Sequence, residues 1–552
     1  MKLQYSISIV LCLSLITFEK IKCGSSSQLS KQQVYVSQNV RLFPTSFVQT
    51  EPLVARHPLN SSILFVTANT FDTTTGFQSE GIYSTTDGGQ TWFGSDTCKG
   101  FLISSHKGNP GIAIDKNGNF ILTRLSSSPG LYSHSSTNNG LSWTAMKKIT
   151  DADLYKATLH SDGDASSSYY GRTYAVWTSL AAPPHKLTIS YTDDGGGNWS
   201  ALKEVNNPAS GTIGKGGEAA ILLNGVIVVC WARAVNSSPF IEDFIGTASS
   251  SNGGATWSVT ENAFDVNGIA GMIPAKANLK TNGWPRIAAD RSGSAYNTRV
   301  YIVTAQKGLS PAGNDPDIVL NRSIDSGKTW SAGIRVNQDA LNNNKYQYFP
   351  AIHIDDGGGV NILYYDDQNT TSDSVGVFLS RSTNGGDSWM DFEVSDHNFK
   401  PAPIAGLSPG YQGDNISLTS SGNTLQAFWM DNSSGHYQIW TAKIDISTLD
   451  VKDDKQEFPS RIRLFQNYPN PFNPLTIINY QLAIDNFVSL KVHNMLGEEI
   501  ATLVNEFQTS GFKSQVWDAS GLPSGVYIYK LVVVGQDGIL SYTDVKKMLL
   551  LR

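Results

Sequence analysis

One eight-residue motif occurs six times between Thr85 and Trp389 of the 552-residue chain, and it restricts the possible folds more than any other feature. Each copy has Ser or Thr at its first position, Asp or Asn at the third, Gly at the fifth and Trp at the eighth. The short polar side chain and the glycine favour a tight turn, and the tryptophan can fill the space between packed sheets. A motif repeated in this way predicts an architecture of repeated β units.

The motif resembles the Asp-box, or bacterial neuraminidase repeat, of sialidases and related β-propellers. In that family the box is a turn on the outer part of a propeller blade and takes no part in catalysis. The resemblance therefore implies a structural role for the third residue of each copy. These residues are Asp87, Asn138, Asp194, Asn252, Asp325 and Asn384.

The segments between motif copies contain short apolar runs bounded by turn residues, as expected for strands. Trp257 and Trp330 are 73 residues apart, whereas the other successive motif tryptophans are 51 to 59 residues apart. Seven strand openings can be counted against six motifs, so the last unit lacks a motif of its own. We expect the segment 33–41 to supply its missing edge strand, because propellers close their ring to remove exposed edges. The expected fold is all-β, with a single propeller over residues 33–450 and seven blades preferred over six.

The character of the sequence changes after Asp454. Residues 465–474 read F-Q-N-Y-P-N-P-F-N-P, and later come the runs G-V-Y-I-Y-K-L and K-K-M-L-L-L-R. These features resemble the type A C-terminal sorting domain carried by cargo of the type IX secretion system. The resemblance implies a small β-sandwich over residues 465–552, after a linker at 451–464, and the secretion machinery as a partner. An ordinary immunoglobulin-like accessory domain is the alternative.

The N-terminal residues 1–24 are typical of a secretory signal peptide, with a short basic start and an apolar stretch that turns polar. No later stretch reaches 18 consecutive apolar residues, so we expect no transmembrane segment after signal removal. The protein is expected to be secreted or attached to the outer cell surface, as a monomer.

Composition and the absence of certain sequence motifs argue against several classes of function. Apolar residues make up 40% of the chain, charged residues 16%, and the net charge is −6, which is typical of a globular chain without a basic face for nucleic acid. No zinc-spaced His/Cys cluster, phosphate-binding glycine loop or G-x-S-x-G motif is present. We therefore expect no metal and no cofactor.

The sialidase resemblance implies an arginine cluster that grips a sugar carboxylate, a tyrosine nucleophile activated by a glutamate, and an aspartate acid/base. The segment from Glu218 to Arg233 looks like the sialidase hairpin in which a Glu opens one strand and an Arg closes the next. Tyr348 is the best candidate nucleophile, with Glu218 as its partner. Arg233, Arg56 and Arg286 are candidate substrate ligands, since arginine binds carboxylates in a bidentate manner.

Other readings of these residues stay open. Glu218 and Arg233 could form a structural ion pair, Tyr348 could simply pack, no Arg-Ile-Pro lies near the N-terminus, and no acid/base aspartate can be assigned. Two functions remain, and whether the protein is an enzyme is not decided by the sequence. The favoured one is a non-catalytic propeller that binds a glycan or a surface protein. The alternative is an exo-acting glycoside hydrolase of the exo-α-sialidase type with a Tyr/Glu nucleophile pair.

Overall fold

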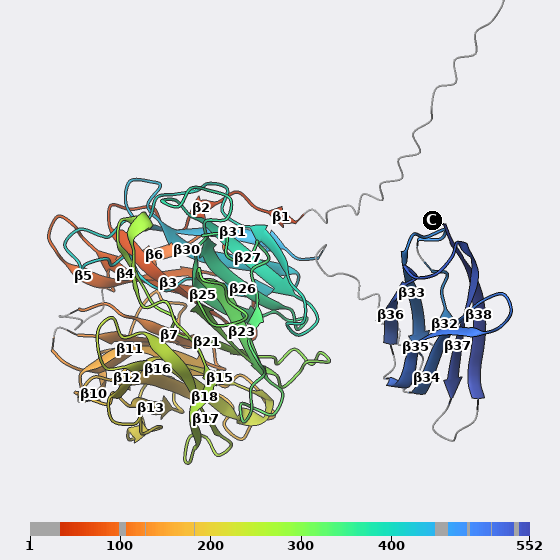
Figure 1. Cartoon of the computed structure of the whole chain (residues 1–552). Helices are drawn as coiled ribbons and strands as arrows, with labels where there is room; N and C mark the ends of the chain where they lie inside the picture. Colours follow the sequence, from red (N-terminus) through yellow and green to blue (C-terminus); the bar gives the residue numbers. More distant parts are fainter. Residues whose placement is uncertain are drawn as a thin grey trace, which may run out of the picture. The chain divides into compact units, whose positions relative to one another are not determined.

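The computed structural model describes residues 34–98, 106–126, 128–181, 183–447, 462–467, 469–482, 486–508, 511–534 and 540–551. The expected signal peptide and most of the expected linker lie outside these residues. The chain divides into two compact units, Met1–Leu449 and Asp450–Arg552 (Figure 1). The described part of the first unit is built from strands and two short 3₁₀ turns, η1 (Leu223–Gly225) and η2 (Pro274–Lys276).

The described part of the first unit contains seven antiparallel sheets of four or five strands and one smaller, two-stranded sheet. The first three sheets are β3 (Val48–Arg56), β4 (Leu64–Phe71), β5 (Gln78–Thr85) and β6 (Phe93–Ser95); β7 (Gly111–Ile114), β8 (Phe120–Leu125), β9 (Leu131–Ser136) and β10 (Lys147–Thr150); and β11 (Leu154–Ser161), β12 (Thr173–Ser179), β13 (Leu187–Thr192) and β14 (Lys203–Glu204). The next three are β15 (Thr212–Ile221), β16 (Ile227–Val235), β17 (Glu242–Ser250) and β18 (Ser258–Asp265); β21 (Arg286–Ala289), β22 (Val300–Gln306), β23 (Asp317–Ser323) and β24 (Ile334–Arg335); and β25 (Gln347–Ile354), β26 (Val360–Asp366), β27 (Gly376–Ser382) and β28 (Met390–Glu393). The last contains β29 (Ser417–Ser421), β30 (Thr424–Asp431) and β31 (Gln438–Asp445) with β1 (Tyr35–Val36) and β2 (Val40–Arg41).

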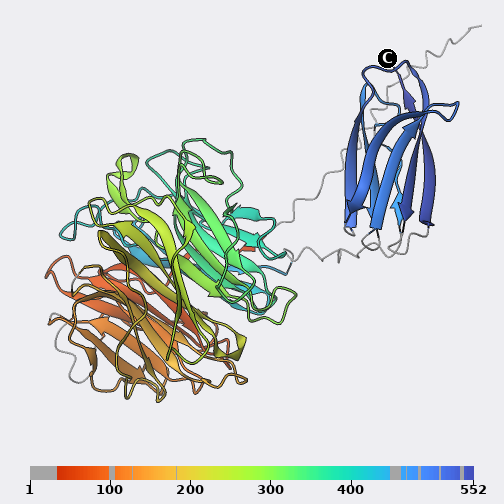
Figure 2. The ribbon, with the colours of Figure 1, turned by 60° about the horizontal axis from the view of Figure 1, so that its bottom comes forward.

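The sheets follow one another in chain order, as the colours show (Figure 1 and Figure 2). Their first strands contact one another in the cyclic order β3, β7, β11, β15, β21, β25, β29 and back to β3. This closed ring is the arrangement of a β-propeller, so the predicted fold class is confirmed. The ring of first strands surrounds a central channel.

The N-terminal strands close the ring, as the sequence predicts. Tyr35 pairs with Asp445 and Val40 with Thr441, so β1 and β2 lie on the outer edge of β31. In the six other sheets, the fourth strand that follows the motif turn occupies this position. The closing sheet therefore contains both ends of the propeller chain.

Sheet packing explains the strand sequences. The run I-V-V-C-W-A at the start of β16 is buried throughout, because each blade packs against a neighbour on both faces. In the C-terminal unit, by contrast, the residues of β37 (Gly525–Val534) alternate between buried and more exposed positions, as in a sheet with one covered face.

The six motif turns share one hydrogen-bond pattern. In the first, the hydroxyl group of Thr85 donates to Asp87 at 2.7 Å and accepts from the backbone N–H of Gly89 at 2.9 Å. The backbone N–H of Thr91 donates to Asp87 at 3.0 Å. The same three bonds measure 2.8–3.0 Å in the other five copies. Hydrogen bonds within the turn thus use the side-chain oxygens of the first and third residues of each motif copy.

The C-terminal unit contains two antiparallel sheets that contribute to one hydrophobic core. One consists of β32 (Arg463–Leu464), β33 (Leu475–Leu482) and β36 (Gly511–Asp518), and the other of β35 (Glu499–Gln508), β34 (Asn486–His493), β37 and β38 (Leu540–Leu550). The proline-rich segment is held against this core. The hydroxyl group of Tyr529 accepts from the backbone N–H of Asn467 and donates to the carbonyl of Phe465, both at 2.8 Å, while Phe472 packs on Trp517.

Within the described ranges, no helix has the length and apolar character needed to span a membrane. The described residues also contain no cluster of three or more His, Cys, Asp or Glu side chains suited to a metal ion. Cys98 and Cys230 are buried free thiols.

Candidate functional site

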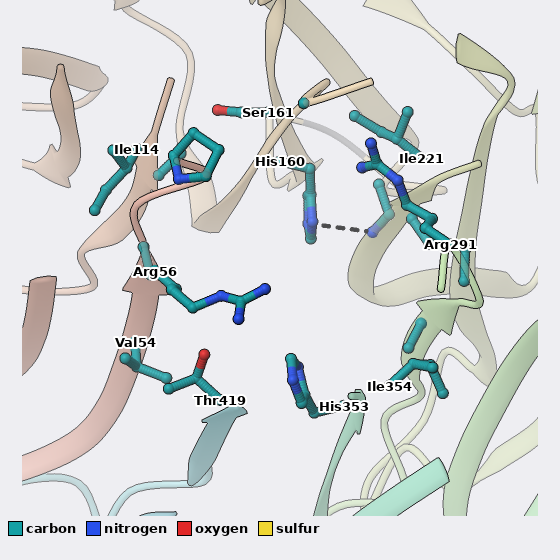
Figure 3. A pocket seen from close by; sticks show the side chains of 18 of the residues that line it. Val54, Arg56, Ile114, His160, Ser161, Ile221, Arg291, His353, Ile354 and Thr419 are labelled. Carbon is teal, nitrogen blue, oxygen red and sulfur yellow. Dashed lines mark hydrogen bonds between the residues drawn. The ribbon is translucent and has the colours of Figure 1, made fainter. Parts of the chain in front are cut away.

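Pockets lie at both ends of the ring of first strands. One pocket, of about 550 Å³, is lined by the C-terminal ends of the first strands, such as Arg56 of β3 and Ile354 of β25. We call it the Arg56 pocket. Figure 3 shows Arg56, His160, His353 and Arg291 extending into this space from different parts of the ring.

Two further pockets lie at the opposite end, where the first strands begin. The Trp284 pocket, of about 350 Å³, is lined by Trp284 and by the start of β15. The Asn69 pocket, of about 510 Å³, is lined by Asn69 and by the start of β3. Both are lined by Tyr155, Lys280 and Tyr411, so we treat them as one groove.

A buried polar network crosses the channel beside this groove. Lys156 of β11 contacts Glu51 at 3.3 Å and Asp414 at 3.1 Å. The side chain of Asn415 donates to Glu51 at 3.1 Å and accepts from Arg286, which also forms an ion pair with Glu218 at 2.9 Å. We call these six residues the channel cluster. They bring four first strands and the loop before β29 together.

Burial and charge shift the pKa values of the channel cluster in opposite directions. Burial raises the pKa of Glu51, although Lys156 partly opposes this. Burial acts on Asp414 in the same direction, but Lys156 and Arg286 outweigh it, so its pKa is lowered. Two carboxyl groups with separated pKa values are a common feature of sites that perform acid/base chemistry.

Glu51 also has an unusual backbone conformation, with φ at 56° and a bulge between Thr50 and Leu53. A non-glycine residue in this region is strained, and the surrounding structure must hold it there. The next residue, Pro52, disfavours the helical region for Glu51. The bulge places the carboxyl group of Glu51 among the channel cluster.

Tyr411 connects the channel cluster to the groove. Its hydroxyl group donates to Glu51 at 2.7 Å and accepts from the side chain of Asn69 at 3.2 Å. Its ring lines both pockets and is partly exposed. Burial and the charge of Glu51 raise the pKa of Tyr411 well above its ordinary value, so the phenol keeps its proton unless a base removes it.

The structure brings Glu218 and Arg286 together, but it does not bring Arg233 to them. Cys230 lies opposite Glu218, while Arg233 lies opposite Gly214. The hairpin turns at Asn224, which has φ at 71°, and a bulge follows at the level of Lys215. Although the segment resembles the sialidase hairpin, Glu218 and Arg233 are therefore not cross-strand neighbours.

The three candidate arginines do not converge on one point. Arg233 pairs with Asp243 at 2.6 Å and stacks on the ring of Phe244. Arg56 pairs with Asp356 at 2.9 Å in the pocket at the far end of the channel. Of the three, only Arg286 lies in the channel cluster.

Tyr348 is fully buried and belongs to the large hydrophobic core, where its ring packs against Tyr365 and Phe349. The ring of Tyr348 contacts aromatic residues. The carboxyl group of Glu218 instead contacts Arg286 and, at 3.9 Å, His160. A nucleophile must reach its substrate, and a tyrosine without exposed surface cannot do so in this conformation. This placement does not fit the expected role of Tyr348 as a nucleophile with Glu218 as its partner.

An additional hairpin explains the long interval between Trp257 and Trp330. Strands β19 (Gly271–Ile273) and β20 (Leu279–Thr281) lie between β18 and β21 in the sequence and form a separate two-stranded sheet. Lys276 between them is fully buried, with its ammonium group 2.6 Å from the buried carboxylate of Asp367. The hairpin ends beside the groove, which Lys280 and Thr281 line.

Sequence reasoning did not assign Tyr411, Lys156 or Asp414 to the site. Tyr411 and Asp414 lie in a loop of ordinary turn composition, and Lys156 is a single charge within a strand. A signal was present for Glu51, because proline in a sheet occurs at an edge, at a strand start or at a bulge, and Pro52 follows Glu51 directly. The long interval between Trp257 and Trp330 was consistent with an inserted element, but it did not indicate where that element lies in the fold.

Comparisons with known proteins identify the C-terminal region. Residues 466–538 match the secretion system C-terminal sorting domain. This domain marks proteins that type IX secretion exports to the cell surface or outside, so the predicted localisation is confirmed. A search among curated proteins found no match.

Solved structures with a similar chain path are distant. A protein of unknown function from Dyadobacter fermentans is 13% identical, with 75% of this chain and 99% of that chain covered and a TM-score of 0.42. A PL25 ulvan lyase is 12% identical over 73% and 95% of the two chains, with a TM-score of 0.47. An α-L-arabinofuranosidase from Fusarium graminearum is 11% identical over 75% and 98%, with a TM-score of 0.42.

Proposed function

We propose that the protein is an exported propeller that binds a glycan in the groove formed by the Trp284 and Asn69 pockets. The observation that carries this proposal is the continuity of the two pockets through Tyr155, Lys280 and Tyr411. Concave sites with aromatic walls and a few convergent polar groups are typical of small-molecule and sugar recognition.

The aromatic walls suit a sugar ring. Tyr155 and Trp284 meet edge to face, with ring centroids 5.0 Å apart, and both side chains are partly exposed. An aromatic face can cover the apolar C–H face of a sugar, while neighbouring amide and carboxyl groups bond its hydroxyl groups. Asn282 lies beside Trp284 and lines the same pocket.

Binding is tested by calorimetry of the full chain against a panel of neutral and acidic oligosaccharides. Trp284→Ala should weaken binding of any glycan that the wild type binds by about tenfold, the effect of losing about 1.4 kcal/mol of contact. Tyr170→Ala is the matched control, because Tyr170 is a partly exposed aromatic residue that contacts Lys116 at the other end of the channel. Failure of the wild type to bind any member of the panel would refute the proposal.

Glycoside hydrolysis is a second candidate, favoured by the contact between Tyr411 and Glu51. In this scheme Glu51 takes the phenolic proton as Tyr411 attacks the anomeric carbon, and a protonated carboxyl group gives its proton to the leaving oxygen. Glu242 lines the groove and burial raises its pKa, but, like Tyr348, it has no exposed surface, so no described groove residue is assigned as the general acid. Turnover of aryl glycosides by the wild type tests this function. If the wild type turns over no aryl glycoside, glycan binding remains as the proposed function.

A further inference from the structure

The groove presents three lysines that form no ion pair with any other residue the structure describes. Lys107 lines the Asn69 pocket, Lys215 lines the Trp284 pocket, and Lys280 lines both. None of the three forms an ion pair within the described part of the chain. Lys107 and Lys280 are exposed, and the ammonium group of Lys215 lies over the ring of Phe240, 4.2 Å from its centroid.

In the described part of the chain, the carboxyl groups near the groove form no ion pair with these lysines, although Glu242 favours the charged form of Lys215. Glu51 and Asp414 share the buried cation Lys156. Glu242 is fully buried and accepts backbone N–H bonds from Gly283 at 3.0 Å and Ala270 at 3.3 Å. The groove is therefore positive, although the chain as a whole carries a net charge of −6.

Two of these lysines also repel each other. Burial lowers the pKa of Lys215, Glu242 opposes this shift, and Lys280 adds to it. An anion placed between the two ammonium groups would remove this repulsion and gain charge-assisted hydrogen bonds. The two ammonium groups are thus more stable with a negatively charged ligand in the groove than without one.

The inserted hairpin places Lys280 where the two pockets meet. The backbone N–H of Lys280 donates to the carbonyl of Gly410 at 2.8 Å, one residue before Tyr411. The buried Lys276 ammonium group binds Asp367 and the carbonyl oxygens of Ser372 and Ser374. The hairpin is thereby fixed to the propeller, and the backbone of Lys280 is held in place before any ligand arrives.

We propose that the groove binds an internal segment of an anionic polysaccharide, with carboxylate or sulfate groups on both sides of Tyr411. This inference rests on the proposed glycan-binding function. A single terminal sugar would occupy one pocket and meet the lysines of that pocket alone. A chain that crosses Tyr411 meets Lys107, Lys280 and Lys215 in turn.

The test compares oligosaccharides of equal length that are uronic-acid-rich, sulfated or neutral, together with the matching monosaccharides, by calorimetry at low and high salt. Lys107→Gln, Lys215→Gln and Lys280→Gln should each weaken binding of the acidic oligosaccharides about three- to tenfold. Lys328→Gln is the control, because Lys328 is an exposed lysine on a motif turn that lines neither pocket. Binding of the acidic chains should also fall as salt increases.

The outcomes separate this inference from the function on which it rests. Preference for either the uronic or the sulfated chain supports it and identifies the anionic group. Equal affinity for the neutral chain overturns the charge argument while glycan binding stands, and a monosaccharide that binds as tightly as the chain overturns the internal-segment argument. Absence of binding to every glycan refutes the proposed function itself.

Discussion

The hydroxyl group of Tyr411 donates a 2.7 Å hydrogen bond to the carboxylate of Glu51, a residue 360 positions earlier in the chain. The contact joins the loop before β29 to β3, and β29 and β3 are the neighbouring first strands at which the ring closes. A contact between a tyrosine and a glutamate was expected for Tyr348 and Glu218, and the structure has one between Tyr411 and Glu51 instead.

If the groove hydrolyses glycosides, Tyr411→Phe should abolish turnover while leaving glycan affinity within about threefold, since only the hydroxyl group is removed. Glu51→Gln should lower turnover similarly, because an amide cannot accept the phenolic proton. Steady-state kinetics with an aryl glycoside, alongside calorimetric binding, measure both effects. Full activity of Tyr411→Phe would exclude Tyr411 as the nucleophile, and Tyr170→Phe serves as the control.

Lys156→Met should destabilise the propeller by about 3 kcal/mol, because it leaves the buried Glu51 and Asp414 without their shared cation. Lys148→Met should change stability little, since the ion pair of Lys148 with Asp151 is exposed to solvent. Chemical denaturation of both variants measures the difference. Equal stability of the two variants would show that the channel cluster is not held by charge.

His397 should make stability depend on pH. Hydrogen bonds to Asp431 and Asp396 raise its pKa from the ordinary 6.5 to about 9. Its stabilising contribution is therefore complete below about pH 6.5 and is lost as the pH rises through about 9. The melting temperature of His397→Gln should lie below that of the wild type at neutral pH and approach it above pH 9. A constant difference across this range would contradict the assignment.

Removal of residues up to 41 should destabilise the whole propeller, because the outer edge of β31 loses its partners β1 and β2. We expect a lower melting temperature and concentration-dependent association through the exposed edge, measured by calorimetry and light scattering. Tyr35→Ser is the control, since the side chain of Tyr35 is largely exposed and its pairing is made by the backbone. An unchanged melting temperature after the deletion would refute the closure argument.

Deletion of residues 451–552 should leave the propeller folded but retained in the periplasm of a host that uses type IX secretion. The deletion removes the sorting domain matched at 466–538 and spares the first compact unit. Immunoblots of periplasmic, surface and medium fractions follow the chain. Delivery of the truncated protein to the surface would contradict this expectation.

Local patterns in the sequence were sufficient to predict much of this architecture. The six motif copies mark the turn between the third and fourth strands, because Asp or Asn, Gly and Ser or Thr at fixed spacing satisfy the same hydrogen bonds wherever they occur. The segment 33–41, which belongs to none of the repeat units, predicted the closing strands, and the proline-rich segment predicted the sorting domain.

The site, by contrast, was decided by tertiary structure. Tyr411 and Glu51 meet because the ring closes, and no pattern within either segment specifies the other. Tyr348 and Glu51 lie at similar bulges of β25 and β3, yet packing buries one among aromatic rings and places the other in the channel. Hydrogen bonds within a turn depend on neighbouring residues and can be read from sequence, whereas contacts across a channel depend on the register and bulges of seven separate strands.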